Sequence, residues 1–155
     1  MRKQDKIIRI ICSVLFFAAV AALGMMFVNT SSEWYMALIR PALQPPPIVF
    51  AAVWTVLYAL LAVSLALVSI LPDVQKKTLG LFAVTGVLNV LWTYTFFEMQ
   101  NPGGAIFVLI ITIITGVALF TDVHRIHKTA SYLLIPYLIW LCFALYLNYE
   151  LAFFN

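Results

Sequence analysis

Charged residues are scarce in this sequence. Lys, Arg, Asp and Glu make up 10% of the 155 residues, against about 25% in an ordinary soluble domain. Hydrophobic residues make up 65% of the chain, and the mean hydropathy is +1.05. A soluble domain of this length exposes too much surface to bury so much apolar material. The composition therefore excludes a soluble globular protein and predicts that lipid surrounds the chain.

Ionisable residues are missing from the middle of every long apolar stretch. The acidic residues Asp73, Glu98, Asp122 and Glu150 fall at the ends of these stretches or between them. Pumps, ion channels and ion-coupled transporters carry charged or ion-coordinating groups within the membrane. The sequence therefore argues against these three classes.

Cysteine and histidine are also rare, which argues against disulfide and metal chemistry. Cys12 and Cys142 fall at different predicted depths, whereas a disulfide needs Cα atoms within about 7 Å. His124 and His127 have only Asp122 nearby as a further ligand, which is too few for a metal site. We therefore expect no metal and no required cofactor.

The sequence does contain long apolar runs, separated by charged or proline-rich loops. A helix that crosses a bilayer needs about 20 apolar residues, because its backbone hydrogen bonds must close within the segment. The runs lack the strict alternation of membrane barrel strands. We predict an all-α membrane protein, a single bundle of five transmembrane helices over residues 1–155. The spans cover residues 10–28, 48–71, 78–97, 104–121 and 131–152.

Lysine and arginine are distributed unequally between the two sides of the predicted bundle. Only Arg40 falls on the side of the 29–47 loop, and all the other basic residues fall on the opposite side. These are Arg2, Lys3, Lys6, Arg9, Lys76, Lys77, Arg125 and Lys128. Because basic loops stay cytoplasmic, we predict the N-terminus inside and the C-terminus outside. The net charge of +3 thus reflects topology and not a nucleic-acid interface.

The loop at residues 29–47 is long, aromatic and rich in proline. Each proline fixes its own φ and restricts the residue before it to extended geometry. Pro47 suits the first turn of the following helix, where a missing N–H costs nothing. Trp34 and Tyr35 could serve only as anchors in the headgroup layer. We favour a rigid lid above the helical bundle.

Three of the predicted helices carry aromatic and amide side chains at helical spacing. Asn89 and Asn148 must face the bundle interior, because lipid cannot satisfy their hydrogen bonds. Aromatic walls with sparse polar anchors are typical of a small-molecule cavity, and ordinary core packing is the alternative. The candidate ligand-binding residues are Phe50, Trp54, Tyr58, Asn89, Trp92, Phe96, Trp140, Ala144 and Asn148 from the helices, with Trp34, Tyr35 and Pro47 from the loop.

Small residues also recur at helical spacing. Gly80, Ala83 and Gly86 follow one stripe of the third predicted span, and Thr112 and Gly116 lie on the fourth. Small residues allow helices to approach closely in lipid. These positions fit either a homodimer contact or packing within one chain.

The sequence resembles a known family. The resemblance rests on Trp34-Tyr35, Leu38, Pro41, Gln44-Pro45-Pro46, Trp54 and Leu57-Tyr58, on Leu88-Asn89, Trp92 and Phe96-Phe97, and on residues 136–149. Together these positions are similar to the signature of the translocator protein family, also called TspO, TspO/MBR or the peripheral benzodiazepine receptor. They extend over residues 34–149, which is most of the chain.

The resemblance implies a membrane receptor or sensor, often a homodimer, that binds porphyrins such as protoporphyrin IX. It also implies binding of isoquinoline carboxamide and benzodiazepine drugs beneath the first loop, with a role in tetrapyrrole regulation and stress response. Ala144 matches a pocket-facing alanine of the family. Some members are reported to degrade porphyrin in light, and Trp54 and Trp140 would then be catalytic. Light- and oxygen-dependent breakdown and transport of tetrapyrroles or lipids are the alternatives.

One position departs from the family pattern. Animal members bind cholesterol near a motif of the fifth helix that ends in Lys or Arg, and here Glu150 follows Tyr149. We therefore do not expect cholesterol as the physiological ligand, and the motif is weak even when complete. The chain shows no mitochondrial presequence pattern, so we predict a bacterial plasma membrane.

Overall fold

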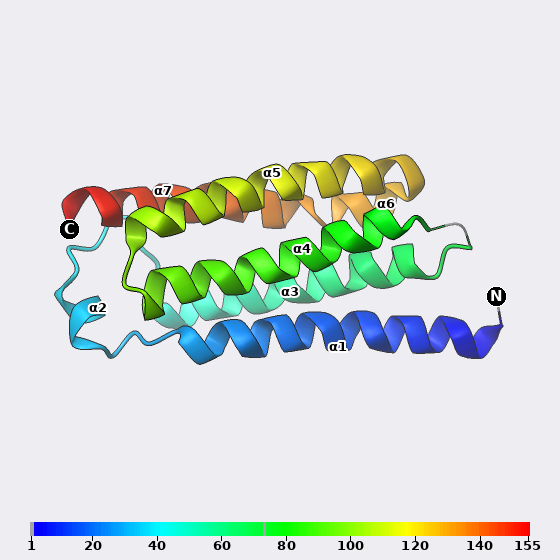
Figure 1. Ribbon diagram of the computed structural model, residues 1–155, viewed down its shortest axis with the longest axis horizontal. Coiled ribbons are helices and arrows are strands. Elements are labelled where there is room, and N and C mark those ends of the chain that lie inside the picture. The colour runs from blue at the N-terminus through cyan, green and yellow to red at the C-terminus, as the bar shows by residue number, and fades with distance from the viewer. Residues whose placement is uncertain (1, 73) are drawn as a thin grey trace.

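The computed structural model describes residues 2–72 and 74–155, and it is helical throughout apart from the connections. Five of its helical segments are long and apolar enough to cross a membrane, and they run side by side along the molecule (Figure 1). No strand occurs among the described residues. The elements are α1 (Lys3–Phe27), α2 (Glu33–Ala37), α3 (Pro47–Ser69), α4 (Lys76–Thr93), the π-helix η1 (Tyr94–Glu98), α5 (Pro102–Ile126), α6 (Lys128–Tyr132) and α7 (Ile135–Phe154). The predicted all-α membrane fold is confirmed.

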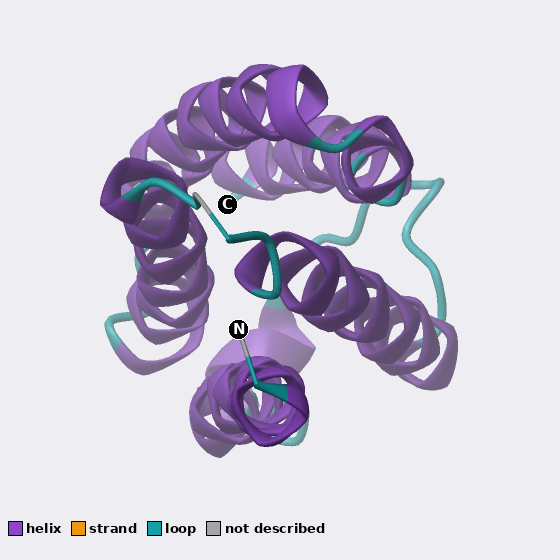
Figure 2. Cartoon of the chain, turned by 90° about the vertical axis from the view of Figure 1, so that its right-hand side faces the viewer, coloured by secondary structure: helices purple, strands orange, loops and turns teal. Residues whose placement is uncertain are grey.

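The long helices pack as neighbours around the bundle axis. Helix α1 packs mainly on α3 and also on α4, while α5 packs on both α4 and α7. Direct contacts of α3 with α4 and with α7 are sparse. Figure 2 looks along the bundle and shows α1, which carries the N-terminus, set apart from α5 and α7. The N-terminus and the C-terminus lie at opposite ends of the molecule (Figure 1).

Two helices extend well beyond their predicted apolar spans. Helix α1 begins at Lys3 rather than at residue 10, because the Asp5 carboxylate accepts from the Arg2 backbone N–H at 3.2 Å and caps the first turn. Helix α5 continues to Ile126 instead of ending at residue 121. Thr78 donates a hydrogen bond of 2.6 Å to Asp122 and so ties this extension to α4. Hydropathy therefore marked the apolar part of each helix and missed its polar turns.

Three local features were not predicted. Helix α4 ends in the π-helix η1, and the turn after it contains Gln100, whose φ is +49°. The predicted span 131–152 is broken between α6 and α7, where Pro136 has no N–H to bond the preceding turn. Ser64 satisfies the Ala130 carbonyl beside this break at 2.9 Å. His124, predicted in a loop, lies within α5 and contacts Ser131 at 2.9 Å.

The small residues are used in different ways. A Cβ added at Gly86 would lie 2.9 Å from Phe16 and from Val20 of α1, so this glycine allows α1 and α4 to approach closely. A Cβ at Gly116 would lie 2.8 Å from Leu138 of α7. Gly80 has no atom within 4 Å of its added Cβ. Packing within the chain thus explains Gly86 and Gly116, and the homodimer stays a prediction.

These distances lead to a paired test on α4. Gly86→Leu should lower the melting temperature of the purified protein, because overpacking costs about 1–3 kcal/mol. Gly80→Leu adds the same side chain to the same helix where there is room, and we expect little change. Thermal unfolding in one detergent measures both variants. Equal melting temperatures for the two would contradict the close approach of α1 and α4.

Candidate functional site

A cavity of about 330 Å³ lies between the helices at the end of the bundle that the 29–47 loop covers. Its wall is mainly apolar, and its lining comes from α1, α3, α4, η1, α7 and the loop. This volume is within the usual range of small-molecule sites. Among the described residues no group of three or more His, Cys, Asp or Glu side chains could hold a metal ion.

Most of the candidate residues meet at this cavity. Three of the twelve, Trp34, Asn89 and Trp140, do not line it. The nine that do are Tyr35, Pro47, Phe50, Trp54, Tyr58, Trp92, Phe96, Ala144 and Asn148. Ligand binding by these residues stays a prediction.

The cavity wall contains a cluster of aromatic rings that pack against one another. Trp54 stacks on Trp92 with ring centroids 5.7 Å apart and planes 30° apart. Tyr58, one turn further along α3, lies 5.4 Å from Trp54, and Phe50, one turn earlier, lies 6.3 Å from Trp92. The four-residue spacing places the α3 rings on one face of the helix. The cluster offers flat apolar surface to a ligand.

Asn148 holds the cavity wall together through two hydrogen bonds. Its Oδ1 accepts from Trp92 Nε1 at 3.0 Å, and its Nδ2 donates to the Pro102 carbonyl at 2.6 Å. This side chain therefore joins α7 to α4 and to the first turn of α5. The bond to Nε1 fixes the orientation of the Trp92 indole in the cavity wall.

Asn89 is buried but lies outside the cavity lining. Its Nδ2 donates to the Thr85 carbonyl and to the Tyr137 hydroxyl, both at 2.8 Å. The sequence placed this amide on the cavity wall because polar groups in lipid turn inward. In the structure the Asn89 side chain does point into the bundle, but it bonds to Tyr137 between α4 and α7 and not to the cavity.

The two remaining tryptophans pack behind the wall. Trp140 lies 5.5 Å from Phe50 and 5.3 Å from Phe143, centroid to centroid. Trp34 packs edge-on against Phe96 at 5.6 Å. Each indole thus supports a residue that lines the cavity, and neither lines it directly.

Two buried polar atoms of the cavity have no partner among the described residues. Trp54 Nε1 is a donor, and Gln44 Oε1 is an acceptor. Both residues line the cavity, and Trp54 is only 8% exposed. A buried donor without a partner costs free energy. These atoms are therefore available to a ligand that offers an acceptor and a donor.

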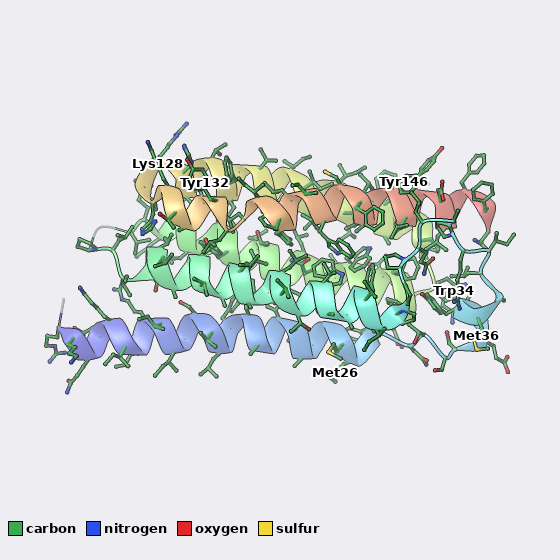
Figure 3. The ribbon with its side chains drawn as sticks, turned by 180° about the vertical axis from the view of Figure 1, so that it is seen from behind. Met26, Trp34, Met36, Lys128, Tyr132 and Tyr146 are labelled. Atoms are coloured by element: carbon green, nitrogen blue, oxygen red, sulfur yellow. The ribbon has the colours of Figure 1, made fainter. Side chains whose placement is uncertain are left out.

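The loop over the cavity is ordered by its own side chains. It contains the short helix α2, whose first turn is capped by Ser32 accepting from the Tyr35 N–H at 3.2 Å. Gln44 Nε2 donates to the Tyr35 hydroxyl at 2.9 Å, and the Tyr35 ring packs on Phe97 at 5.6 Å. Arg40 lies 5.2 Å above the same ring. Trp34 and Met36 mark this loop at one end of the molecule in Figure 3.

The end of α7 also holds the loop. Asn155 Oδ1 accepts from the Ile39 N–H at 2.8 Å, and Asn155 Nδ2 donates to the Ile39 carbonyl at 3.2 Å. One amide side chain therefore satisfies both backbone groups of a loop residue. The loop is tied to α7 by this pair and to η1 by aromatic packing.

The sequence interpretation missed the part of the wall that α1 supplies. Ala21, Gly24, Met25 and Val28 all line the cavity. A Cβ added at Gly24 would lie 3.6 Å from Thr93 of α4, and the run of alanines before Gly24 was the available signal. Gln44 was assigned to the loop but not to the site.

Comparison with known proteins agrees with this architecture. The model of the TspO/MBR family matches residues 12–154. The chain is 34% identical to the tryptophan-rich protein TspO of Chlorobaculum tepidum over 86% of this chain and 87% of that protein. It is 33% identical to the tryptophan-rich sensory protein of Cereibacter sphaeroides, over 76% and 74%, and 34% identical to the translocator protein of Bos taurus, over 77% and 73%. The chain is an integral membrane protein that belongs to the TspO/MBR family.

Proposed function

We propose that this protein is a membrane receptor or sensor for porphyrins such as protoporphyrin IX. The observation that carries the proposal is the cavity of about 330 Å³, walled by stacked aromatic rings and covered by the 29–47 loop. A planar macrocycle can stack on indole faces, and such contacts add to the energy of apolar burial. Isoquinoline carboxamide and benzodiazepine drugs are flat and apolar in the same way.

The polar groups around the cavity fit the periphery of such a ligand. Trp54 Nε1 can donate to a carboxylate or carbonyl oxygen, and Gln44 Oε1 can accept from the O–H of a protonated propionic acid. Arg40 lies on the loop against Tyr35, where its charge can attract the propionates of a porphyrin. None of the described residues that line the cavity is Asp, Glu, His, Lys or Arg, so its interior suits the uncharged body of the ligand.

The names of two relatives correspond to a sensor and to a transporter. One is called a sensory protein and another a translocator protein. We favour the sensor because the loop covers one end of the cavity. Asn155 of α7 holds it there through Ile39, and the bond from Gln44 to Tyr35 orders it internally. Transport of tetrapyrroles or lipids is the alternative, and ligand flux into sealed vesicles that contain the protein would support it.

The homodimer and the predicted orientation in a plasma membrane belong to the same proposal.

Ala144 provides a direct test of the site. Ala144→Leu should weaken binding of protoporphyrin IX by roughly tenfold or more, equivalent to about 1.4 kcal/mol, because the larger side chain fills space in the cavity. Quenching of tryptophan fluorescence measures the affinity. Ala59→Leu, at an exposed position of α3 outside the lining, is the control. Unchanged affinity in a folded Ala144→Leu protein would remove the porphyrin from this cavity.

The loop can be tested through the hydroxyl of Tyr35. Tyr35→Phe deletes the hydrogen bond from Gln44, whose net worth is about 0.5–1.5 kcal/mol. Tyr35 and Gln44 both belong to the loop and line the cavity, so losing their bond makes the loop itself less rigid. We therefore expect dissociation of protoporphyrin IX to become several times faster, as measured by stopped-flow fluorescence. Tyr149→Phe removes an exposed hydroxyl from α7 and should leave the rate unchanged. The idea of a closing loop fails if both variants release ligand at the wild-type rate.

A light- and oxygen-dependent breakdown of bound porphyrin is the second candidate activity. The observation that favours it is that the Trp54 indole lines the cavity. Its Nε1, like that of Trp140, has no partner among the described residues. Indoles can donate an electron to an excited macrocycle without a general acid or base. Trp140 lies behind Phe50, so any role of Trp140 in this reaction would be relayed through its neighbours.

The two tryptophans can be separated by illumination. With porphyrin bound and dioxygen present, Trp54→Phe should lower the initial rate of porphyrin bleaching by at least about tenfold, a barrier change of about 1.4 kcal/mol. Trp140→Phe should have a much smaller effect, because its ring does not line the cavity. Absorbance at saturating porphyrin separates the reaction from binding. Bleaching at the wild-type rate in Trp54→Phe would rule out this indole as the electron donor.

A further inference from the structure

A second cavity of about 470 Å³ lies at the opposite end of the bundle, between α1, α3 and α4. Figure 1 shows the start of α1 and the connection from α3 to α4 at this same end. It shares no lining residue with the first cavity. Its lining residues are Arg9, Cys12, Ser13, Phe16, Leu65, Ser69, Val74, Lys76, Leu79, Phe82 and Ala83.

The polar part of this cavity is basic. Arg9 of α1 donates to the carbonyl of Ser69 at the end of α3, which holds its guanidinium beside the opening and leaves further N–H donors unused. Lys76 is the first residue of α4, where the helix dipole is positive. Neither residue forms an ion pair within the described part of the chain. Among the residues that the structure describes, no Asp or Glu lines the cavity.

The deeper wall is apolar and reaches the surface that faces lipid. Leu65 and Phe82 are buried, while Leu79 and Ala83 are exposed on the outer side of α4. Ser13 points its hydroxyl to the Arg9 carbonyl at 2.8 Å and lies 3.5 Å from Ser69. The cavity therefore offers cationic groups at one edge and an apolar wall beside them, open to the side of the bundle.

We propose that this cavity binds one anionic phospholipid from the leaflet at the basic end of the bundle. The phosphate lies with Arg9 and Lys76, and an acyl chain follows Phe16, Leu79 and Phe82. Basic pockets between transmembrane helices are suited to anionic headgroups, and an acyl chain gains free energy from the apolar wall. A free phosphate ion would use the cations and gain nothing from the rest of the cavity.

Other basic residues at this end are differently placed. Lys77 is turned toward α5, where it pairs with Asp122 at 3.0 Å. Arg125 and Lys128 are exposed and line neither cavity, and Figure 3 shows Lys128 at the end where α1 begins. If the lipid binds at the cavity, removing Arg9 and Lys76 should reduce binding more than removing Arg125 and Lys128. If the basic end attracts anionic lipid only in general, the two pairs should have equal effects.

The experiment compares two double variants with the same loss of charge. Arg9→Gln with Lys76→Gln removes both cations of the cavity, and Arg125→Gln with Lys128→Gln removes two cations outside it. Each protein is placed in mixed micelles with phosphatidylglycerol or phosphatidylcholine, and native mass spectrometry measures the retained lipid. We expect wild type and the second variant to retain phosphatidylglycerol roughly tenfold more than phosphatidylcholine, a difference of about 1.4 kcal/mol. The first variant should lose this preference.

A steric variant tests the acyl chain separately. Ala83→Phe should reduce retention of phosphatidylglycerol without changing the charge, because the ring enters the apolar side of the cavity. Ala59→Phe adds the same ring to an exposed position of α3 outside the lining and should retain lipid as wild type does. Melting temperatures in neutral detergent identify any variant that is misfolded. If Arg9→Gln misfolds, Lys76→Gln alone is compared with Lys128→Gln alone, and only Lys76→Gln should weaken the preference for phosphatidylglycerol.

Several outcomes would overturn the proposal. Equal loss of lipid in the two double variants would indicate general charge attraction, and no loss in either would remove the site. Displacement of the lipid by millimolar inorganic phosphate would identify a soluble anion as the occupant. Porphyrin affinity is measured on the same proteins and should not change, so failure of the lipid site is distinguishable from failure of the porphyrin site.

Discussion

Lipid offers no hydrogen-bond partners, and the arrangement of polar side chains in this bundle follows from that constraint. Asn148 is paired on both sides of its amide, with Trp92 and with the Pro102 carbonyl. Asn89 pairs with Tyr137, and Ser64 pairs with the carbonyl beside the break between α6 and α7. These bonds link helices that apolar packing alone would leave free to rotate, since lipid chains compete with apolar side chains. They therefore restrict the rotation of α4 and α7 against each other and fix the rings of Trp92 and Tyr137.

The first cavity exists because the helices are not packed equally. Helix α5 packs on both α4 and α7, whereas α3 has few direct contacts with α4 or α7. Large rings on α3 and α4 fill part of the resulting space, and Ala21 and Gly24 on α1 leave the remainder open. At this cavity the pairing of polar groups is incomplete, at Trp54 Nε1 and Gln44 Oε1. A ligand would complete it.

The sequence was sufficient for the fold and for nine of the residues that line the cavity. Composition and hydropathy predicted the five spans, and helical spacing placed Phe50, Trp54 and Tyr58 on one face. Spacing alone could not separate Trp140 from Ala144, because both lie on the same face of α7 and differ only in their distance from the break near Pro136. It also could not reveal the contribution of α1, since small residues indicate room and do not indicate what occupies it. The ends of α1 and α5 depended on capping and on Thr78, which hydropathy does not measure.

The 29–47 loop is held mainly by two kinds of contact. Its directional bonds are internal, as between Ser32 and Tyr35, except where Asn155 pairs with Ile39. The loop packs against the π-helix η1 through aromatic rings, Trp34 on Phe96 and Tyr35 on Phe97. Lifting the loop would expose apolar area and break the pair between Asn155 and Ile39, while the bonds within the loop stay intact. Opening would then carry a positive heat-capacity change, so the apolar contribution to closure would weaken on cooling and tie ligand access to temperature.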